Sequence, residues 1–229
     1  MDIHTPKQLV LIRHGQSLLQ EARPGRYFET QESKQKIKGL PDHRIELSRE
    51  GLRQALSAGK KLPELFGEFD AIYHSGFMRA KQTAQALMAS TGSDSRLLEN
   101  ILLNERDTGY THGLTAAEVE IHFPYLSSYH ESVGEFYFRF PGGESFADVC
   151  ERARVWLTQI AVAYAGKNVC AVTHWGMIVA IRYNLESWDE DKFMRRVGTE
   201  EIGNCSATLF TYDADYYKLV YRNTEVLAQ

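Results

Sequence analysis

The chain has 229 residues and a mass of 26.1 kDa; 43% of the residues are hydrophobic and 24% are charged. A chain of this length buries about 70–75% of its unfolded surface, so these values allow a substantial core and exclude a disordered or fibrous protein. The 26 Lys and Arg against 30 Asp and Glu leave a formal net charge of −4, which disfavours nucleic acid as a partner because nucleic-acid binding needs a basic face.

The first third of the chain predicts alternating strands and helices. Residues 8–12 (QLVLI) form a short apolar run that is typical of a strand buried on both faces. Residues 20–44 are polar and contain Gly and Pro, which predicts a long functional loop. Ser48 is a candidate N-cap of a helix, and residues 71–73 and 78–88 predict a second strand and a following helix.

The middle of the chain continues this alternation. Residues 97–103 predict a strand that ends at Asn104-Glu105, and Thr115 opens a capping box (TAAE) at the start of a short helix. Residues 122–141 are rich in aromatic side chains and predict an irregular segment. After Gly143, apolar residues at helical spacing indicate a long amphipathic helix.

The last third adds one more strand and helix and then a hairpin. Residues 169–172 predict a strand, residues 177–185 a helix, and residues 207–212 and 217–221 a hairpin around 213–215. Strands that alternate with helices favour an α/β three-layer sandwich, with a mostly parallel sheet and helices on both faces. We find no repeat or linker and expect a single domain over residues 1–229.

Polar residues follow each predicted strand at the point where it ends. Arg13 and His14 follow the first strand, Arg79 lies shortly after the second, Glu105 follows the third, and His174 follows the fourth. Ligands of open α/β sheets bind at the carboxyl ends of the strands, so we expect these side chains to converge there.

These residue types suit phosphoryl transfer. Guanidinium groups bind a phosphate as bidentate forks, a neutral imidazole is a nucleophile near pH 7, and a carboxylic acid can protonate the leaving oxygen. Gly15 is expected to let the backbone approach the phosphate. Each residue taken singly is more often structural, and Glu105-Arg106 could be a surface ion pair. The five residues together are therefore stronger evidence for a phosphoryl-transfer site than any one of them alone.

Six sequence blocks resemble the histidine phosphatase superfamily, which includes phosphoglycerate mutase-like proteins. The blocks occur in the family's order between residues 8 and 180. They are RHGQS at 13–17, GLPD at 39–42 followed by LS at 47–48 and QA at 54–55, SGFMRAKQTA at 75–84, LNER at 103–106, PGGES at 141–145, and VTHWG at 172–176.

The resemblance implies a role for each strand-end residue. His14 would be the nucleophile that becomes a phosphohistidine, and Arg13, Arg79 and His174 would bind the phosphate oxygens. Glu105 would protonate the leaving group and later activate water. The resemblance implies a small phosphorylated metabolite as substrate, a phosphomonoester hydrolase as activity, and neither a metal nor an organic cofactor.

Two positions depart from the family's pattern, and two segments are candidates for choosing the substrate. Gln20 stands near a position where the family often has Asn, and Trp175 replaces the Gly usual after the second histidine; both are candidate substrate-binding residues. The glycolytic mutase signature is missing from the longer loop at 20–38, which disfavours that activity. Residues 20–44 and 122–140 are expected to form the rim, although a solvated loop and a satellite apolar cluster would explain them equally well.

Other readings of the sequence are weaker. No cysteine begins a Cys-x5-Arg motif, and Asp213-Ala214-Asp215 is better explained as a hairpin turn than as an aspartyl-phosphate nucleophile. Residues 143–147 come close to a nucleophile elbow, but no strand precedes them, so Ser145 is expected to cap a helix or to contact the site from the end of that helix. A phosphoglycerate-type mutase and a non-catalytic phosphate-binding regulator on the same fold stay open as alternatives.

The cysteines and the apolar runs bear on the cellular compartment in which the protein is expected. Cys150, Cys170 and Cys205 are odd in number and form no CxxC pair, so we expect buried, reduced thiols rather than a disulfide framework or a zinc site. The apolar run at 9–12 is shorter than a signal-peptide core or a membrane span. The chain is expected to be cytoplasmic, with no membrane partner.

Overall fold

A six-stranded sheet forms the centre of the computed structural model, which describes residues 5–23, 25–91, 95–213 and 216–223. The strand order is β3-β2-β4-β1-β5-β6, in which β1 to β4 are parallel and the last two strands are antiparallel. The strands are β1 (Gln8–Arg13), β2 (Ala71–His74), β3 (Arg96–Glu99), β4 (Asn168–Thr173), β5 (Ala207–Asp213) and β6 (Tyr216–Asn223). The mostly parallel sheet is confirmed, as is the hairpin, although residues 214 and 215 between its strands lie outside the described residues.

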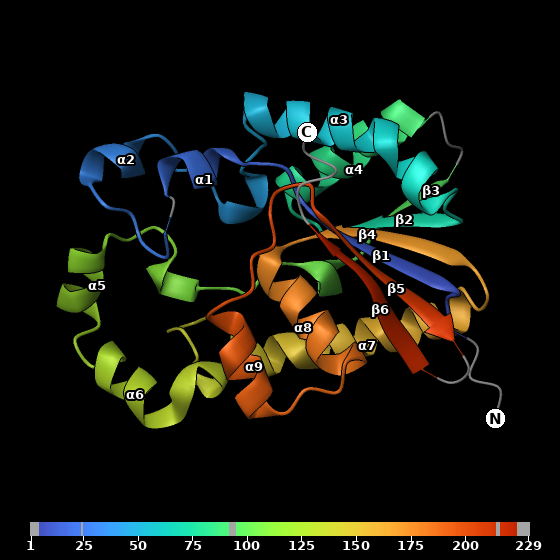
Figure 1. The fold of residues 1–229 in the computed structure, drawn as a ribbon. Helices are drawn as coiled ribbons and strands as arrows, with labels where there is room; N and C mark the ends of the chain where they lie inside the picture. Colours follow the sequence, from blue (N-terminus) through green and yellow to red (C-terminus); the bar gives the residue numbers. More distant parts are fainter. Residues whose placement is uncertain (1–4, 24, 92–94, 214–215, 224–229) are drawn as a thin grey trace.

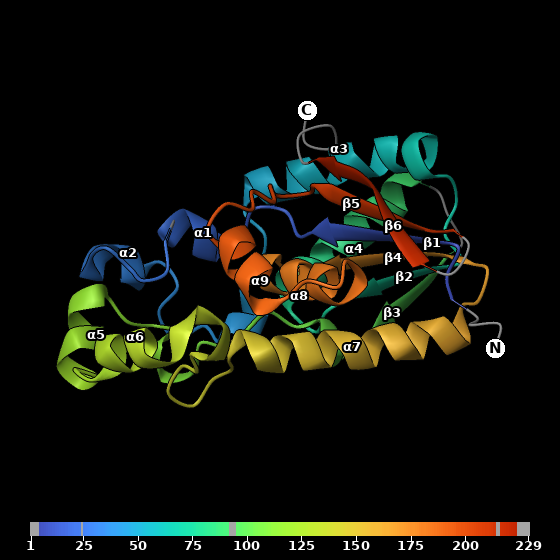
Figure 2. The ribbon, with the colours of Figure 1, turned by 60° about the horizontal axis from the view of Figure 1, so that its bottom comes forward.

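Helices cover both faces of this sheet, which confirms the three-layer sandwich (Figures 1 and 2). Side chains alternate along β1: Val10 and Ile12 pack with α3 (Arg49–Phe66) and α4 (Met78–Thr91), whereas Leu9 and Leu11 pack on the opposite face. That second face is covered by α7 (Phe146–Ala163) and α8 (Trp175–Leu185), and α9 (Glu190–Val197) packs beside them. Because residues 9–12 of β1 are buried on both faces of the sheet, this part of the strand is apolar along its whole length and has no polar face.

Helix caps form where the sequence places them. The side chains of Ser48, Thr115 and Ser145 each accept a hydrogen bond from a backbone N–H in the first turn of the helix that follows. Ser145 is therefore a capping residue, in agreement with the rejection of a nucleophile elbow there. The predicted helix at 177–185 begins two residues earlier, at Trp175.

Residues 20–44 are not the continuous loop that the sequence predicts. They hold parts of two short helices, α1 (Leu18–Ala22) and α2 (Gln31–Gln35), and a 3₁₀ turn η1 (Asp42–Arg44). Capping boxes at Ser17 and Thr30 start the two helices. A small apolar cluster stabilises the segment and consists of Leu19, Ala22, Phe28, Ile37 and Ile45.

The expectations for residues 122–141 and 97–103 were also wrong in part. Residues 122–141 contain α6 (Leu126–Tyr137), which follows α5 (Ala116–His122) and is interrupted at Gly134, where φ is +73°. The strand β3 ends at Glu99, because Asn100 then accepts a hydrogen bond from Leu102 N–H and starts the 3₁₀ turn η2 (Ile101–Leu103). A further 3₁₀ turn, η3 (Gly109–Thr111), follows. The helix α9 has no counterpart among the predicted elements.

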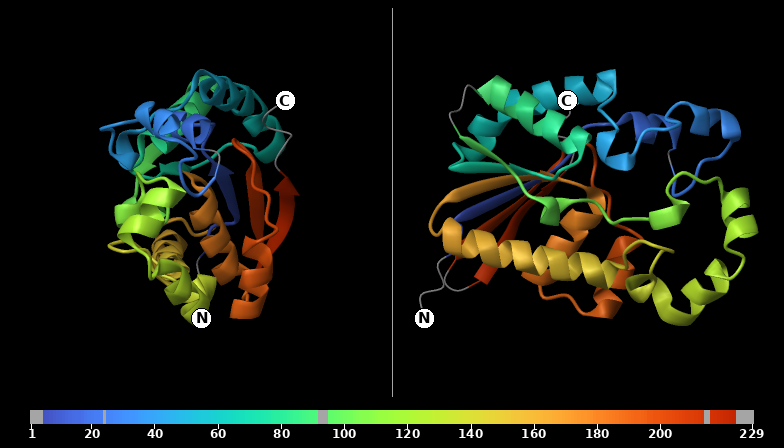
Figure 3. Two further views of the ribbon diagram at one scale, coloured as in Figure 1. Left: turned by 90° about the vertical axis from the view of Figure 1, so that its left-hand side faces the viewer. Right: turned by 180° about the vertical axis from the view of Figure 1, so that it is seen from behind.

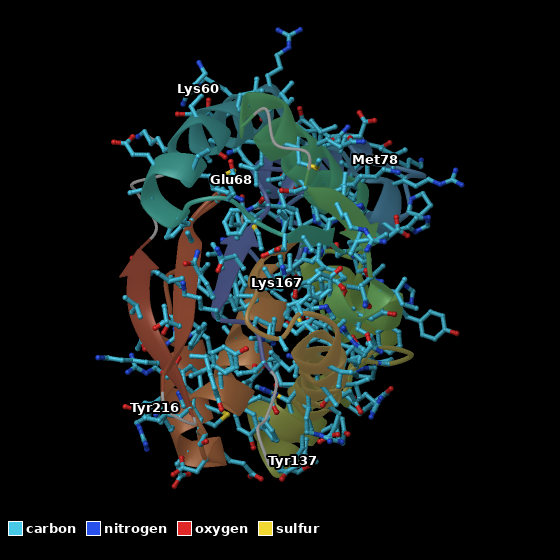
Figure 4. The ribbon with its side chains drawn as sticks, turned by 90° about the vertical axis from the view of Figure 1, so that its right-hand side faces the viewer. Lys60, Glu68, Met78, Tyr137, Lys167 and Tyr216 are labelled. Atoms are coloured by element: carbon cyan, nitrogen blue, oxygen red, sulfur yellow. The ribbon has the colours of Figure 1, made fainter. Side chains whose placement is uncertain are left out.

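The two ends of the sheet differ. Helices α1, α2, α5 and α6 project beyond the end at which the parallel strands finish, and they face the viewer in the left-hand view of Figure 3. Figure 4 looks at the opposite end, with Lys167 near the centre just before β4 and Tyr216 of β6 below it. Among the described residues, no helix combines the length and the apolar character needed to cross a bilayer.

Candidate active site

The five predicted strand-end residues lie at the same end of the sheet. Arg13 is the last residue of β1, and His14 follows it; Arg13 pairs in register with Thr173 of the parallel strand β4, so His174 lies beside them. Arg79 belongs to the first turn of α4, after β2, and Glu105 follows η2. We call His14, His174, Arg13 and Arg79 the inner cup.

The two imidazole rings of the inner cup are in edge contact, with centroids 4.9 Å apart. His14 Nδ1 lies 2.7 Å from the carbonyl oxygen of Gly15. Because a carbonyl oxygen can only accept, Nδ1 carries the hydrogen of a neutral ring and Nε2 carries the lone pair. This arrangement leaves Nε2 as the nucleophilic nitrogen.

Both rings are held in the neutral form. Burial, and then the charges of Arg79 and Arg13, hold the pKa of His14 well below its usual value of 6.5. The same causes, with His14 added, lower the pKa of His174. Neutral His14 is the form that can attack phosphorus at neutral pH.

Several buried polar atoms around the inner cup have no hydrogen-bond partner among the described residues. His174 Nε2 is 2.7 Å from Ser75 Oγ, but its Nδ1 is unpartnered, as are Arg13 Nε and Ser206 Oγ. Arg13 Nη1 donates to the carbonyl oxygen of Ile202, which fixes the side chain. Buried unpartnered donors are rare and costly, so a cluster of them indicates a place for an acceptor-rich ligand.

Arg79 is fixed on one edge only. Its Nη1 donates to the Asp42 carboxylate at 2.7 Å and to the Asp42 carbonyl oxygen at 3.0 Å, and its guanidinium lies 4.7 Å from the centre of the Phe77 ring. Although burial acts to raise it, Arg79 and His112 hold the pKa of Asp42 below its usual 3.8. Asp42 therefore stays ionised and orients Arg79, while Nε and Nη2 carry no described hydrogen bond.

Glu105 is held next to the start of α8. Its carboxylate accepts hydrogen bonds from the backbone N–H groups of Gly176, at 3.1 Å, and Arg106, at 3.0 Å. Burial raises the pKa of Glu105 above its usual 4.5, against the effect of these two donors. A side chain at Gly176 would place its Cβ 2.5 Å from Glu105 Oε1, so glycine is required for this contact.

Arg152 anchors the loop that carries Glu105. It makes five hydrogen bonds, two to the Glu144 carboxylate and three to the carbonyl oxygens of Leu102, Asn104 and Glu105. These bonds tie the loop to α7. Nothing in the sequence pattern singled out Arg152, because three of its five hydrogen bonds go to backbone oxygens about 50 positions earlier in the chain.

Two details correct the sequence interpretation. Arg106 does not form a surface ion pair with Glu105; it is buried, and its guanidinium contacts Glu135 at 2.8 Å and the Phe138 carbonyl oxygen at 2.6 Å. At Gly15, a Cβ atom would come within 2.4 Å of the Gly51 carbonyl oxygen. Close packing against the start of α3 thus explains this glycine without invoking a ligand.

The two candidate substrate-binding residues both have protein partners. The Gln20 side chain bonds to that of Asn204, whose Nδ2 donates to the His14 carbonyl oxygen at 2.8 Å. Trp175 Nε1 donates to the carbonyl oxygen of Glu200 at 3.1 Å. Gln20 thus supports the backbone of His14 through Asn204. The indole N–H of Trp175 is already bonded to the protein and is not free to bind a substrate.

A pocket lies next to the inner cup, and we call it the outer pocket. Its volume is about 790 Å³, and Glu105 and Phe77 form part of its wall. The other lining residues are Asp42, His43, Ile101, Leu102, Asn104, Asp107, His112, Gly142, Gly143, Glu144 and Arg152. Asp42 and His43 belong to residues 20–44, one of the two segments expected to form the rim, but none of the lining residues belongs to residues 122–140.

The comparisons with known proteins agree with this architecture. The family model of the histidine phosphatase superfamily (branch 1) matches residues 9–225. A 2,3-bisphosphoglycerate-dependent phosphoglycerate mutase of Bartonella tribocorum is 33% identical over 219 residues, which cover 91% of this chain and 94% of the relative.

Two solved structures are similar over almost their whole length. A mycobacterial glucosyl-3-phosphoglycerate phosphatase, solved with VO3, is 25% identical, with a TM-score of 0.73 and coverage of 95% of this chain and 99% of its own. A phosphoserine phosphatase of Entamoeba histolytica, solved with 3-phosphoglyceric acid, has a TM-score of 0.70 at 22% identity, covering 97% of this chain and 99% of its own. The second likeness concerns the fold alone.

Proposed function

The chain belongs to the histidine phosphatase superfamily (branch 1) and is a phosphoric monoester hydrolase, and we propose that it acts through a covalent phosphohistidine at His14. The substrate is a small phosphorylated molecule whose phosphate occupies the inner cup. The single observation that carries the proposal is the neutral His14 ring, with Nδ1 bonded to Gly15, beside the unpartnered donors of Arg13 and His174.

In the first step, His14 Nε2 attacks phosphorus and the bond from phosphorus to the ester oxygen breaks. Arg13, Arg79 and His174 donate hydrogen bonds to the phosphate oxygens and stabilise the charge of the transition state. Glu105 acts in its protonated form, which burial favours by raising the pKa of the carboxyl group, and transfers its proton to the leaving oxygen. The alcohol leaves, and the phosphoryl group stays on His14.

In the second step, water replaces the alcohol. The Glu105 carboxylate removes a proton from the water as its oxygen attacks phosphorus, and the bond from phosphorus to His14 Nε2 breaks. The products are inorganic phosphate, a neutral His14 ring and a protonated Glu105, so the enzyme is ready for another cycle. Besides the substrate and this water, the cycle uses only side chains of the protein.

Turnover of phenyl phosphate tests the proposal. We expect wild-type protein to release phosphate and His14→Ala to lose activity by at least about 10⁴-fold, because the nucleophile is absent. His122→Ala is the matched control, since His122 is an exposed histidine of α5, and it should keep full activity. Undiminished turnover by His14→Ala would remove His14 as the nucleophile.

A mutase activity is the second candidate, because the Bartonella tribocorum relative carries that name at 33% identity. Both activities share the first step and differ in what accepts the phosphoryl group. Incubation with 3-phosphoglycerate tests the mutase: a mutase yields the isomeric 2-phosphoglycerate, whereas a phosphatase yields none and is detected by the inorganic phosphate that it releases from phenyl phosphate. We propose the phosphatase, acting as one domain over residues 1–229 in the cytoplasm.

A further inference from the structure

The outer pocket differs in charge from the phosphate site, and we infer that it selects phosphomonoesters whose alcohol part carries no negative charge and offers an apolar face. This inference rests on the proposed function, because it concerns the leaving group of the same reaction. It names a substrate class that excludes phosphoglycerates, even though a relative is named for acting on them.

The position of Glu105 links the outer pocket to the leaving group. Glu105 lines this pocket, whereas His14, His174, Arg13 and Arg79 do not. The ester oxygen must lie beside the group that protonates it, so the rest of the alcohol extends from Glu105 into the outer pocket. Its volume of about 790 Å³ is large enough for an alcohol well beyond three carbons.

Four of the thirteen residues that line this pocket are acidic; Asp42 is paired with Arg79 and Glu144 with Arg152, whereas Asp107 has no cationic partner in the described contacts. Besides Glu105, it contains Asp42, Asp107 and Glu144, and only one arginine, Arg152. Asp107 is exposed, and its Oδ1 accepts a hydrogen bond from Gly109 N–H at 2.7 Å, so its charge faces no cation in the described contacts. A carboxylate or second phosphate on the substrate would be repelled here.

The guanidinium of Arg152 is not available to a substrate anion. Arg side chains have five N–H donors, and the five hydrogen bonds of Arg152 go to Glu144 and to three carbonyl oxygens. Binding a substrate carboxylate would require breaking these bonds and freeing the loop of Glu105. Arg152 is therefore a positioning residue, and its charge is paired with that of Glu144.

His112 of the wall does not supply the missing positive charge. Burial, partly offset by the charge of Asp42, lowers the pKa of His112, so its ring is neutral at pH 7. Arg23 lies against His112, with Nη1 bonded to the His112 carbonyl oxygen, and is not part of the wall. Arg139, which donates to the carbonyl oxygen of the lining residue Gly143, is paired with Asp148 at 2.5 Å.

An apolar strip completes the wall. Phe77, Ile101 and Leu102 line the outer pocket, and Ile101 is 68% exposed. Covering such surface with an apolar part of a ligand gains roughly 25 cal/mol per Å². The wall thus offers apolar contacts and negative charge, a combination that fits neutral or cationic alcohols with an aromatic or aliphatic face.

Three phenyl phosphates that differ only in the para group test the inference. We compare kcat/KM for phenyl phosphate, 4-(aminomethyl)phenyl phosphate and 4-carboxyphenyl phosphate at low ionic strength. The carboxylate substrate should be at least about tenfold slower than phenyl phosphate, and the amine substrate equal or faster. A para carboxylate makes the phenol a slightly better leaving group, so a lower rate cannot come from leaving ability.

Asp107→Asn provides the matched variant, because the amide oxygen can still accept the Gly109 N–H. The variant should lower the ratio of kcat/KM for phenyl phosphate to kcat/KM for 4-carboxyphenyl phosphate by about threefold. Glu151→Gln, an exposed residue on α7, is the control and should leave the ratio unchanged. A carboxylate substrate that is as fast as phenyl phosphate, or a ratio that Asp107→Asn does not move, overturns the inference.

Binding measurements separate this inference from the proposed function. Calorimetric titration with benzylphosphonate and its 4-carboxy and 4-aminomethyl derivatives measures the charge preference without any turnover. Weak binding of the carboxy compound together with no hydrolysis of any ester would retain the inference about charge and reject the phosphatase. Equal binding of all three phosphonates, with normal hydrolysis of phenyl phosphate, would retain the phosphatase and reject the inference.

Discussion

The inner cup and the outer pocket adjoin at Glu105 but are built from opposite charges. The inner cup holds two guanidinium groups and buried donors that have no protein partner. The outer pocket holds carboxylates, and its single arginine is fully bonded to the protein. The phosphate is therefore bound and transferred in the inner cup, whereas the outer pocket selects among alcohols. Variants on either side of this boundary should affect different steps.

Glu105 lies on the boundary, and Glu105→Gln should have the largest effect among the variants that retain His14. We expect phosphoenzyme formation from an alkyl phosphate to slow by about 10²–10⁴-fold, because an amide cannot protonate the alkoxide. An aryl phosphate, whose leaving group needs little protonation, should be slowed far less. Rapid-quench measurement of both substrates checks this, and equal slowing would argue against the acid role.

The same residue predicts a pH dependence. The pKa of Glu105 is raised by burial, and the protonated form is the active acid. The rate constant of phosphoenzyme formation from an alkyl phosphate should therefore be highest below that raised pKa and should fall as the pH rises through it. In Glu105→Gln the rate constant should not show this decrease. A rate that increases with pH over the same range would contradict a protonated Glu105.

Arg79→Lys should have the next largest effect. A lysine keeps the positive charge but loses the fork that bonds Asp42 on one edge and phosphate on the other, at a cost of about 10²-fold in kcat/KM. Arg154→Lys, at an exposed ion pair on α7, is the matched control and should retain wild-type rates. Wild-type kinetics in Arg79→Lys would place phosphate binding elsewhere.

Gly176→Ala tests how closely Glu105 must be held. The new Cβ would lie 2.5 Å from Glu105 Oε1, so the carboxyl group must move. We expect alkyl phosphate turnover to fall by about 10–10²-fold with a smaller loss for aryl esters. Gly113→Ala, where a Cβ would meet no atom within 4 Å, is the control. A uniform loss for both ester types would indicate a general disturbance of α8.

Asp42→Asn should have the smallest effect, and it should strengthen phosphate binding rather than weaken it. Asparagine keeps an oxygen that accepts from Arg79 Nη1 but removes a negative charge close to the bound dianion. Inhibition by inorganic phosphate should become about threefold tighter, because repulsion is reduced. The inhibition constant measured with phenyl phosphate checks this. Weaker inhibition would mean that the charge of Asp42 is needed to orient Arg79.

The strands and the positions of the inner cup could be predicted from the sequence for a simple reason. Buried parallel strands are apolar along their whole length, as in residues 9–12, and the residue that follows such a strand must lie at the edge of the sheet. His14 and His174 follow from this rule alone. Arg79 and Glu105 were expected at the same edge because they come shortly after predicted strands, but Arg79 lies in the first turn of α4 and Glu105 follows η2, so the rule places them less directly, and the sequence blocks that resemble a family also contain them.

The rest of the site depends on contacts between distant parts of the chain. Asp42 meets Arg79 across 37 positions, and Asn204 meets His14 across 190. Asp42 stood inside a recognised block, yet only the folded segment of residues 18–44 brings it to Arg79. Its helices of five residues are too short for a periodic pattern and depend on side-chain caps and a small apolar cluster. Local sequence therefore could not reveal them.

The central claim is that His14 accepts the phosphoryl group inside the inner cup. Rapid acid-free quenching with ³²P-labelled phenyl phosphate, followed by peptide mapping, tests it most directly. The account predicts a phosphoenzyme that is stable to alkali, labile to acid and labelled on His14, and that is absent from His14→Ala. Label on another residue, or equal labelling of the His14→Ala protein, would contradict it.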